Sequence, residues 1–157
     1  MKPVLFLDID GVLNSEMWYR KRHKGNWTEE REFDPEAVWL LKAVVAMSGC
    51  EIVVSSSWRI GRTLEELQAI PALSSFTIIG KTPQTSLKDN GRGAEVDMWL
   101  KEHCESPRRY AIVDDGGDFY EHQNLVRTDW KLGLTPWHCE ELVRLLTTDN
   151  PGAADGS

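Results

Sequence analysis

The chain has 157 residues, of which 41% are hydrophobic and 27% are charged, and this composition is ordinary for a globular protein with one buried core. No apolar stretch reaches the roughly 20 residues that cross a bilayer, and the first apolar run is too short for a secretory signal. A net charge of −7 argues against a surface that coats nucleic acid broadly. The three cysteines lack metal-ligand spacing, so we expect reduced thiols in a cytoplasmic protein with no membrane partner.

Short apolar runs alternate with helical patterns, and this alternation predicts an α/β fold built on a mainly parallel sheet. The expected elements, in chain order, are strand 4–7 (or 4–9), helix 35–48, strand 51–54, helix 64–70, strand 76–79, helix 94–103, strand 110–113, strand 125–127 and helix 136–147. Asp34 before Pro35 indicates a helix start, Gly49 a helix end, and Thr63 with Glu66 a capping box. We therefore expect a single domain over residues 1–148.

Two segments do not follow this pattern. Residues 14–33 are polar, aromatic and basic with no clear period, and they predict a small insertion or a minimal cap. Their basic run at residues 20–24 (RKRHK) has two interpretations, a solvated loop or a basic lip that attracts an anionic substrate. Residues 149–157 are mostly small and polar, and we expect a disordered tail there.

Polar side chains follow three of the predicted strands at the point where each strand ends. Asp8 and Asp10 follow the first strand, residues 55–57 (SSS) follow the second, and Asp114 with Asp115 follows the fourth. In an open parallel sheet, ligands bind beyond the carboxyl ends of the strands, so we expect these groups to converge. An oxygen-rich site without histidine or cysteine suits a hard cation such as Mg²⁺ rather than zinc.

These residues resemble the motifs of the haloacid dehalogenase (HAD) superfamily of phosphohydrolases. "DIDGV" is similar to the first motif, "EIVVSSSWR" to the second, and "YAIVDDGGD" to the fourth, in the family's order. Arg92, in "GRGAEVDMWL", lies where the third motif has a lysine or arginine before a helix; Lys81 and Lys88 are competing candidates. The resemblance covers roughly residues 4–130 and implies a HAD-like Rossmannoid three-layer sandwich with a minimal cap.

The resemblance implies a role for each matching residue. Asp8 would attack phosphorus and form an aspartyl-phosphate, and Asp10 would protonate the leaving alcohol and then activate water. Ser55 or Ser56, with Ser57 left open, would hydrogen-bond the phosphoryl oxygens. Arg92 would balance negative charge on the nucleophile and on the transferring group.

The resemblance also implies a Mg²⁺ site. Its expected ligands are the Asp8 carboxylate, the main-chain carbonyl of Asp10 and the Asp115 carboxylate, with Asp114 or Asp118 in support. Gly11 would permit the sharp backbone exit that leaves both early carboxylates facing the site.

A narrower resemblance concerns "SSSWR", "RGAEVDMWL" and "AIVDD", which are similar to the phosphatase halves of polynucleotide kinase-phosphatases and to HAD domains grouped with RNA-repair proteins. In those relatives an arginine shortly after the second-motif serine contacts the substrate, and Arg59 matches that position. The leading hypothesis is a Mg²⁺-dependent phosphomonoesterase that acts on nucleotides or on nucleic-acid 3′-phosphate ends. The alternatives are a HAD phosphatase of small phosphometabolites and a non-catalytic HAD-like binding or scaffold domain.

Overall fold

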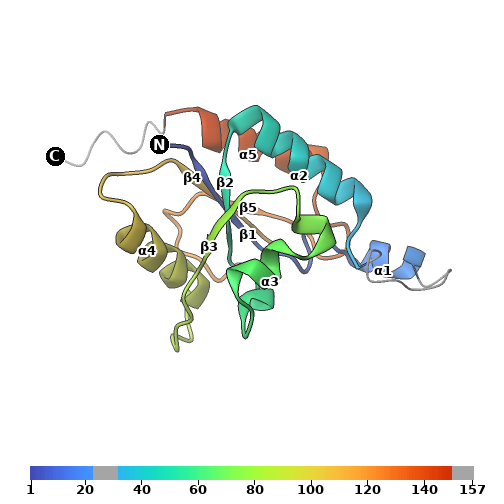
Figure 1. Cartoon of the computed structure of the whole chain (residues 1–157), viewed down its shortest axis with the longest axis horizontal. Coiled ribbons are helices and arrows are strands. Elements are labelled where there is room, and N and C mark those ends of the chain that lie inside the picture. Colours follow the sequence, from blue (N-terminus) through green and yellow to red (C-terminus); the bar gives the residue numbers. More distant parts are fainter. Residues whose placement is uncertain (23–31, 150–157) are drawn as a thin grey trace.

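A computed structural model describes residues 1–22 and 32–149 of the chain (Figure 1). Its sheet has five strands, all parallel, in the order β3-β2-β1-β4-β5. The strands are β1 (Val4–Leu7), β2 (Glu51–Val54), β3 (Ile78–Lys81), β4 (Tyr110–Asp114) and β5 (Leu125–Arg127). The helices are α1 (Glu16–Arg22), α2 (Pro35–Ser48), α3 (Leu64–Gln68), α4 (Gly91–His103) and α5 (Pro136–Thr147), with short 3₁₀ helices at Ser57–Arg59 and Pro71–Leu73.

The sheet lies between two layers of helices. Leu5 and Leu7 of β1 pack into one core with residues of α2, α3 and α5, whereas Val4 and Phe6 pack on the other face with α4. Figure 1 shows α2 and α5 side by side over one face of the sheet, with α4 on the opposite side. Successive strand residues point to opposite faces, so a strand buried on both faces is apolar throughout. The three-layer α/β architecture predicted from the sequence is confirmed.

The predicted helix ends are confirmed where local chemistry sets them. The Asp34 carboxylate accepts a hydrogen bond from the backbone N–H of Glu36, and Gly49 ends the same helix with a φ of 67°. Thr63 and Glu66 form the predicted capping box at the start of α3. These signals need only neighbouring residues, so they can be recognised without the fold.

The third strand and the fourth helix differ from the prediction in their bounds. Strand β3 covers Ile78–Lys81 rather than 76–79, and α4 begins at Gly91 rather than at residue 94. Gly80 lies within the strand, where an added Cβ would come within 2.9 Å of Trp99 Nε1. The glycine serves the packing of α4 on the sheet rather than a turn.

The segment 14–33 contains a helix that the sequence pattern did not predict. Helix α1 has seven residues and none of them is buried, so it carries no apolar stripe from which to predict it. Residues 23–31 of the expected insertion and 150–157 of the expected tail lie outside the described residues. No helix among the residues described is long and apolar enough to span a membrane.

The register of the sheet sets the position of the strand ends. Leu7 of β1 pairs with Val54 of β2 and with Val113 of β4. The residues that follow these three strands therefore emerge level at one edge. The chain order also reverses direction between β1 and β4, and this switch point is where open α/β sheets bind ligands.

Candidate active site

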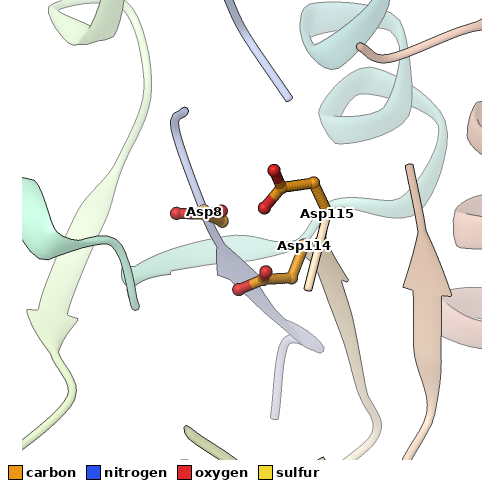
Figure 2. A group of neighbouring side chains, drawn as sticks. All are labelled: Asp8, Asp114 and Asp115. Atoms are coloured by element: carbon orange, nitrogen blue, oxygen red, sulfur yellow. The ribbon is translucent and has the colours of Figure 1, made fainter. Parts of the chain in front are cut away.

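Three acidic side chains meet at this switch point (Figure 2). Asp8 follows β1, Asp114 ends β4, and Asp115 comes next in the chain. One carboxylate oxygen from each residue lies within 4.8 Å of the other two. Asp8 and Asp114 are buried and Asp115 is half-buried. Acids from the first and fourth motifs thus form a single cluster, although most of the chain separates them.

The cluster disfavours its own ionisation. Burial raises the pKa of Asp8 to about 8, repulsion from Asp114 adds to the rise, and the charge of Arg92 acts in the opposite direction. The pKa of Asp114 is raised as well, chiefly by burial, with Arg92 again opposing. Carboxylates that are buried together hold protons until a positive charge compensates them. Full ionisation of these acids therefore requires more positive charge than Arg92 supplies.

Among the residues that the structure describes, Arg92 is the cation that contacts the cluster. Its Nη1 lies 3.1 Å from Asp114 Oδ2 and 3.6 Å from Asp8 Oδ1, and it donates to the backbone carbonyl of Ser55 at 2.6 Å. Lys81, one of the competing candidates, donates instead to backbone carbonyls, including that of Arg62 at 2.5 Å. Arg92 sits in the first turn of α4, two residues before the predicted start of that helix.

Gly11 is needed for more than its backbone conformation. Its φ is +78°, which favours glycine, and an added Cβ would lie 2.3 Å from Asp115 Oδ2. The missing side chain therefore leaves the space that the Asp115 carboxylate occupies. A link between the first and the fourth motif at this position cannot be seen from either motif alone.

The donor set of the cluster fits a hard divalent cation. It offers only carboxylate oxygens, from Asp8, Asp114 and Asp115, and like charges this close need a positive partner. Oxygen ligands suit Mg²⁺, whereas zinc sites in proteins mostly use histidine and cysteine. Asp118, the other acid considered for support, instead accepts a long 3.4 Å hydrogen bond from the backbone N–H of Arg92.

The Asp10 side chain lies outside this cluster and is held by two donors. The indole Nε1 of Trp58 donates to both carboxylate oxygens, at 3.1 and 3.2 Å. The amide Nδ2 of Asn14 donates to Oδ1 at 2.9 Å. Asp10 is exposed while Asp8 is buried, so the two early acids face different environments. Neither contact was predicted; the one from Trp58 joins loops that follow two different strands.

The serines after β2 differ in what their hydroxyls do. The Ser56 hydroxyl accepts from the backbone N–H of Trp58 and caps the short 3₁₀ helix. The Ser55 hydroxyl is buried and has no hydrogen-bond partner among the residues that the structure describes. Ser57 is exposed. A buried hydroxyl left without a partner is costly, which makes Ser55 the better candidate to bind a phosphoryl oxygen.

Arg59 does not have the role that its position suggested. Its guanidinium is buried and donates to four backbone carbonyls and to Glu95 Oε2 at 2.9 Å. Two of those carbonyls belong to Ser55 and Ser56. A guanidinium has five N–H donors, so none remains for a substrate. The expected contact of Arg59 with the substrate is therefore wrong. Its guanidinium instead has a structural role and supports the loop of the serines through their backbone carbonyls.

The basic run at residues 20–24 is described only in part. Arg20 forms an ion pair with Glu16, and Arg22 forms one with Glu32. His23 and Lys24 lie outside the described residues. Arg20 also borders a cavity beside Asp10, so this end of α1 lies close to the site.

Residues 4–139 match the family described as the HAD domain in Swiss Army Knife RNA repair proteins. The chain belongs to this family. No curated protein and no solved structure matches the chain. Membership of the HAD RNA-repair family confirms the resemblance read from the motifs and supports a phosphatase or a related role.

In a HAD RNA-repair domain the acidic cluster has a plain interpretation, because HAD domains typically use a metal. The matched range includes the acids at both β1 and β4, the serine loop and Arg92. The family description also connects the fold with RNA repair and hence with phosphorylated nucleic acid. The family description names neither a metal nor the bond that is cleaved, so both are inferred from the residues of the site.

Proposed function

We propose that this chain is a Mg²⁺-dependent phosphomonoesterase that forms an aspartyl-phosphate on Asp8 and acts on nucleotides or nucleic-acid 3′-phosphate ends. One observation carries the proposal: Nη1 of Arg92 lies 3.6 Å from Asp8 and 3.1 Å from Asp114, within a cluster of three acids. A nucleophilic carboxylate, a fixed cation and two further oxygen ligands are thereby gathered at one point. Phosphoryl transfer depends mainly on such positioning and charge neutralisation.

The first step transfers the phosphoryl group to the protein. An oxygen of Asp8 bonds to phosphorus, the ester P–O bond breaks, and the leaving oxygen takes the proton of the Asp10 carboxyl group. Two unit charges about 4 Å apart repel by about 4 kcal/mol at an effective dielectric of 20, so Asp8 cannot approach a phosphate unaided. Arg92 opposes that repulsion. The carboxylates of Asp8, Asp114 and Asp115 and the carbonyl of Asp10 would hold Mg²⁺, which would supply further positive charge.

The second step releases phosphate. The Asp10 carboxylate takes a proton from water, the water oxygen bonds to phosphorus, and the bond from phosphorus to Asp8 breaks. Trp58 and Asn14 act as positioning residues, since their N–H groups hold the Asp10 carboxylate in one orientation. In both steps the Ser55 hydroxyl donates a hydrogen bond to a phosphoryl oxygen.

Two observations support a nucleic-acid substrate. The family is described by its occurrence in RNA repair proteins. The described part of the segment after the first motif contains only the seven-residue α1, rather than a helical bundle that would enclose a small metabolite. A site under so small a cap suits a phosphate carried on a long chain.

A phosphatase screen tests the proposal. Purified protein is assayed with and without Mg²⁺ on p-nitrophenyl phosphate, nucleotides, 3′- and 5′-phosphorylated oligonucleotides, phosphopeptides and sugar phosphates. We expect Mg²⁺-dependent release of phosphate from nucleotides or 3′-ends, with none from the Asp8→Asn variant. Preference for sugar phosphates would favour the metabolite phosphatase, and no hydrolysis of any substrate would favour the scaffold.

A further inference from the structure

A cavity of about 660 Å³ opens beside Asp10, between α1 and the turn that follows β5. We call it the α1 groove, and the residues that matter here are Asp10, Asn14, Tyr19, Arg20, Asp115 and Trp130. Asp10 is the proposed proton donor to the leaving oxygen. Whatever is attached to that oxygen must therefore lie on the side of Asp10, where the groove is.

The walls of the groove are fixed to the active site. The backbone N–H of Glu16, at the start of α1, donates to the carbonyl of Trp130 at 3.0 Å. The hydroxyl of Thr128 donates to the carbonyl of Gly11 at 2.8 Å, which ties the segment before Trp130 to the first motif. The two sides of the groove therefore hold a set distance from each other and from Asp10, and little ordering is required on binding.

The side chains of the groove combine aromatic rings with cations. Trp130 is 52% exposed, and the Nζ of Lys131 lies 5.9 Å from its ring centroid. On the other wall, the guanidinium of Arg22 lies 4.2 Å from the ring centroid of Tyr19, beside Arg20. The groove thus places exposed aromatic surface next to Arg20, while its lining also includes the carboxylates of Asp10, Glu16 and Asp115. An exposed aromatic ring gives a base a surface on which to stack, whatever the sequence.

Tyr19 also carries a polar group toward the acid. Burial, and then the negative charge of Asp10, raise the pKa of Tyr19 to about 12. A tyrosine hydroxyl is protonated at neutral pH even at its ordinary pKa of about 10, so Tyr19 offers a hydrogen-bond donor to a ligand in the groove. A sugar hydroxyl or ring oxygen is a fitting acceptor.

We propose that the α1 groove binds the terminal nucleoside of the substrate, with its base stacked on Trp130 and its sugar beside Tyr19. The groove has room for one nucleoside, since small-molecule sites of about 300–1,000 Å³ hold ligands of that size. Stacking accepts every base, so recognition is of an unpaired end rather than of a sequence. This inference rests on the proposed function, because it assigns the leaving group of that reaction.

The test compares two substrates in three proteins. One substrate is a short 3′-phosphorylated oligonucleotide that ends in thymidine, and the other ends in a tetrahydrofuran abasic residue. The ratio of kcat/KM between them is measured for the wild-type protein, for Trp130→Ala and for Trp137→Ala. Trp137 is an exposed tryptophan on α5 outside the groove, so it controls for loss of a surface indole.

We expect the wild-type protein to prefer the substrate with a base by about 5- to 100-fold, as loss of a stacked base predicts. Trp130→Ala should reduce that ratio to near one, Trp130→Phe should restore part of it, and Trp137→Ala should leave it unchanged. Equal ratios in the wild-type protein and Trp130→Ala would overturn the groove assignment while phosphatase activity still stands. A phosphopeptide whose hydrolysis falls as much in Trp130→Ala would also overturn it. Absence of any phosphatase activity would instead refute the proposed function.

Discussion

Replacing Asp8 with asparagine should stabilise the metal-free protein, and the gain should increase with pH. The reason is that the pKa of Asp8 is about 8 in the folded protein against 3.8 for an ordinary aspartate. The folded state therefore holds this proton more tightly than the unfolded state. The stability that depends on this protonation is complete below about pH 4 and is lost as the pH rises through about 8. Asparagine, which does not titrate, avoids that loss.

The distances in the cluster set the size of the effect at high pH. At the 4.8 Å limit, each neighbouring carboxylate repels an ionised Asp8 by about 3.5 kcal/mol at an effective dielectric of 20. Arg92 at 3.6 Å offsets about 4.6 kcal/mol, which leaves about 2 kcal/mol of net repulsion before the burial of the charge is counted. With burial included, the rise in pKa sets a ceiling of about 6 kcal/mol. We expect a gain between these limits near pH 9.

Urea unfolding in EDTA, at about pH 6 and pH 9, measures the free energy of unfolding of both proteins. The difference between Asp8→Asn and the wild type should be larger at the higher pH by about 2–3 kcal/mol. Asp89→Asn, at an exposed aspartate, is the matched control and should show no such dependence. If Asp8→Asn is no more stable than the wild type at either pH, the repulsion inferred for the cluster is absent.

Three other predictions concern the residues around the cluster. Trp58→Phe keeps a ring but removes the N–H that donates to Asp10, so kcat/KM for a nucleoside phosphate should fall at least about tenfold. Hydrolysis of p-nitrophenyl phosphate, whose leaving group needs no proton, should be unaffected. Equal losses of kcat/KM on the two substrates would refute the positioning role. Arg92→Ala should lower kcat/KM about 10²- to 10³-fold, and Arg92→Lys should recover part of the loss in the same assay; full activity of Arg92→Ala would contradict its role. Glu95→Gln leaves the buried guanidinium of Arg59 unpaired and should destabilise the protein to urea by about 3 kcal/mol, against little change for the exposed Glu102→Gln on the same helix.

The parts of the fold that were predicted correctly depend on short-range chemistry or on a general rule of sheets. Asp34 with Pro35 and the Thr63 capping box identify helix starts because each cap involves residues two or three positions apart. The meeting of Asp8 with Asp114 follows from the convergence of parallel strand ends at a switch point. Both kinds of inference need the order of elements but not the packing of side chains.

The parts that were missed depend on contacts between distant segments. Arg59 follows the serines in the sequence, yet the 3₁₀ helix turns its guanidinium inward to Glu95 of α4, and no local pattern reports that direction. The hydrogen bond from Trp58 to Asp10 likewise joins loops that follow two different strands. Helix α1 was missed for another reason, since it buries none of its residues and has no apolar period.

The space beside Gly11 provides a criterion for judging other members of the family. A relative can retain every acid of the cluster and still lose the arrangement of these acids if any side chain replaces this glycine, because the first carbon would overlap the Asp115 carboxylate. Intact aspartates are therefore insufficient evidence of an active enzyme. A bulkier residue at this position would mark a homologue that keeps every acid in its sequence but cannot arrange them as this chain does.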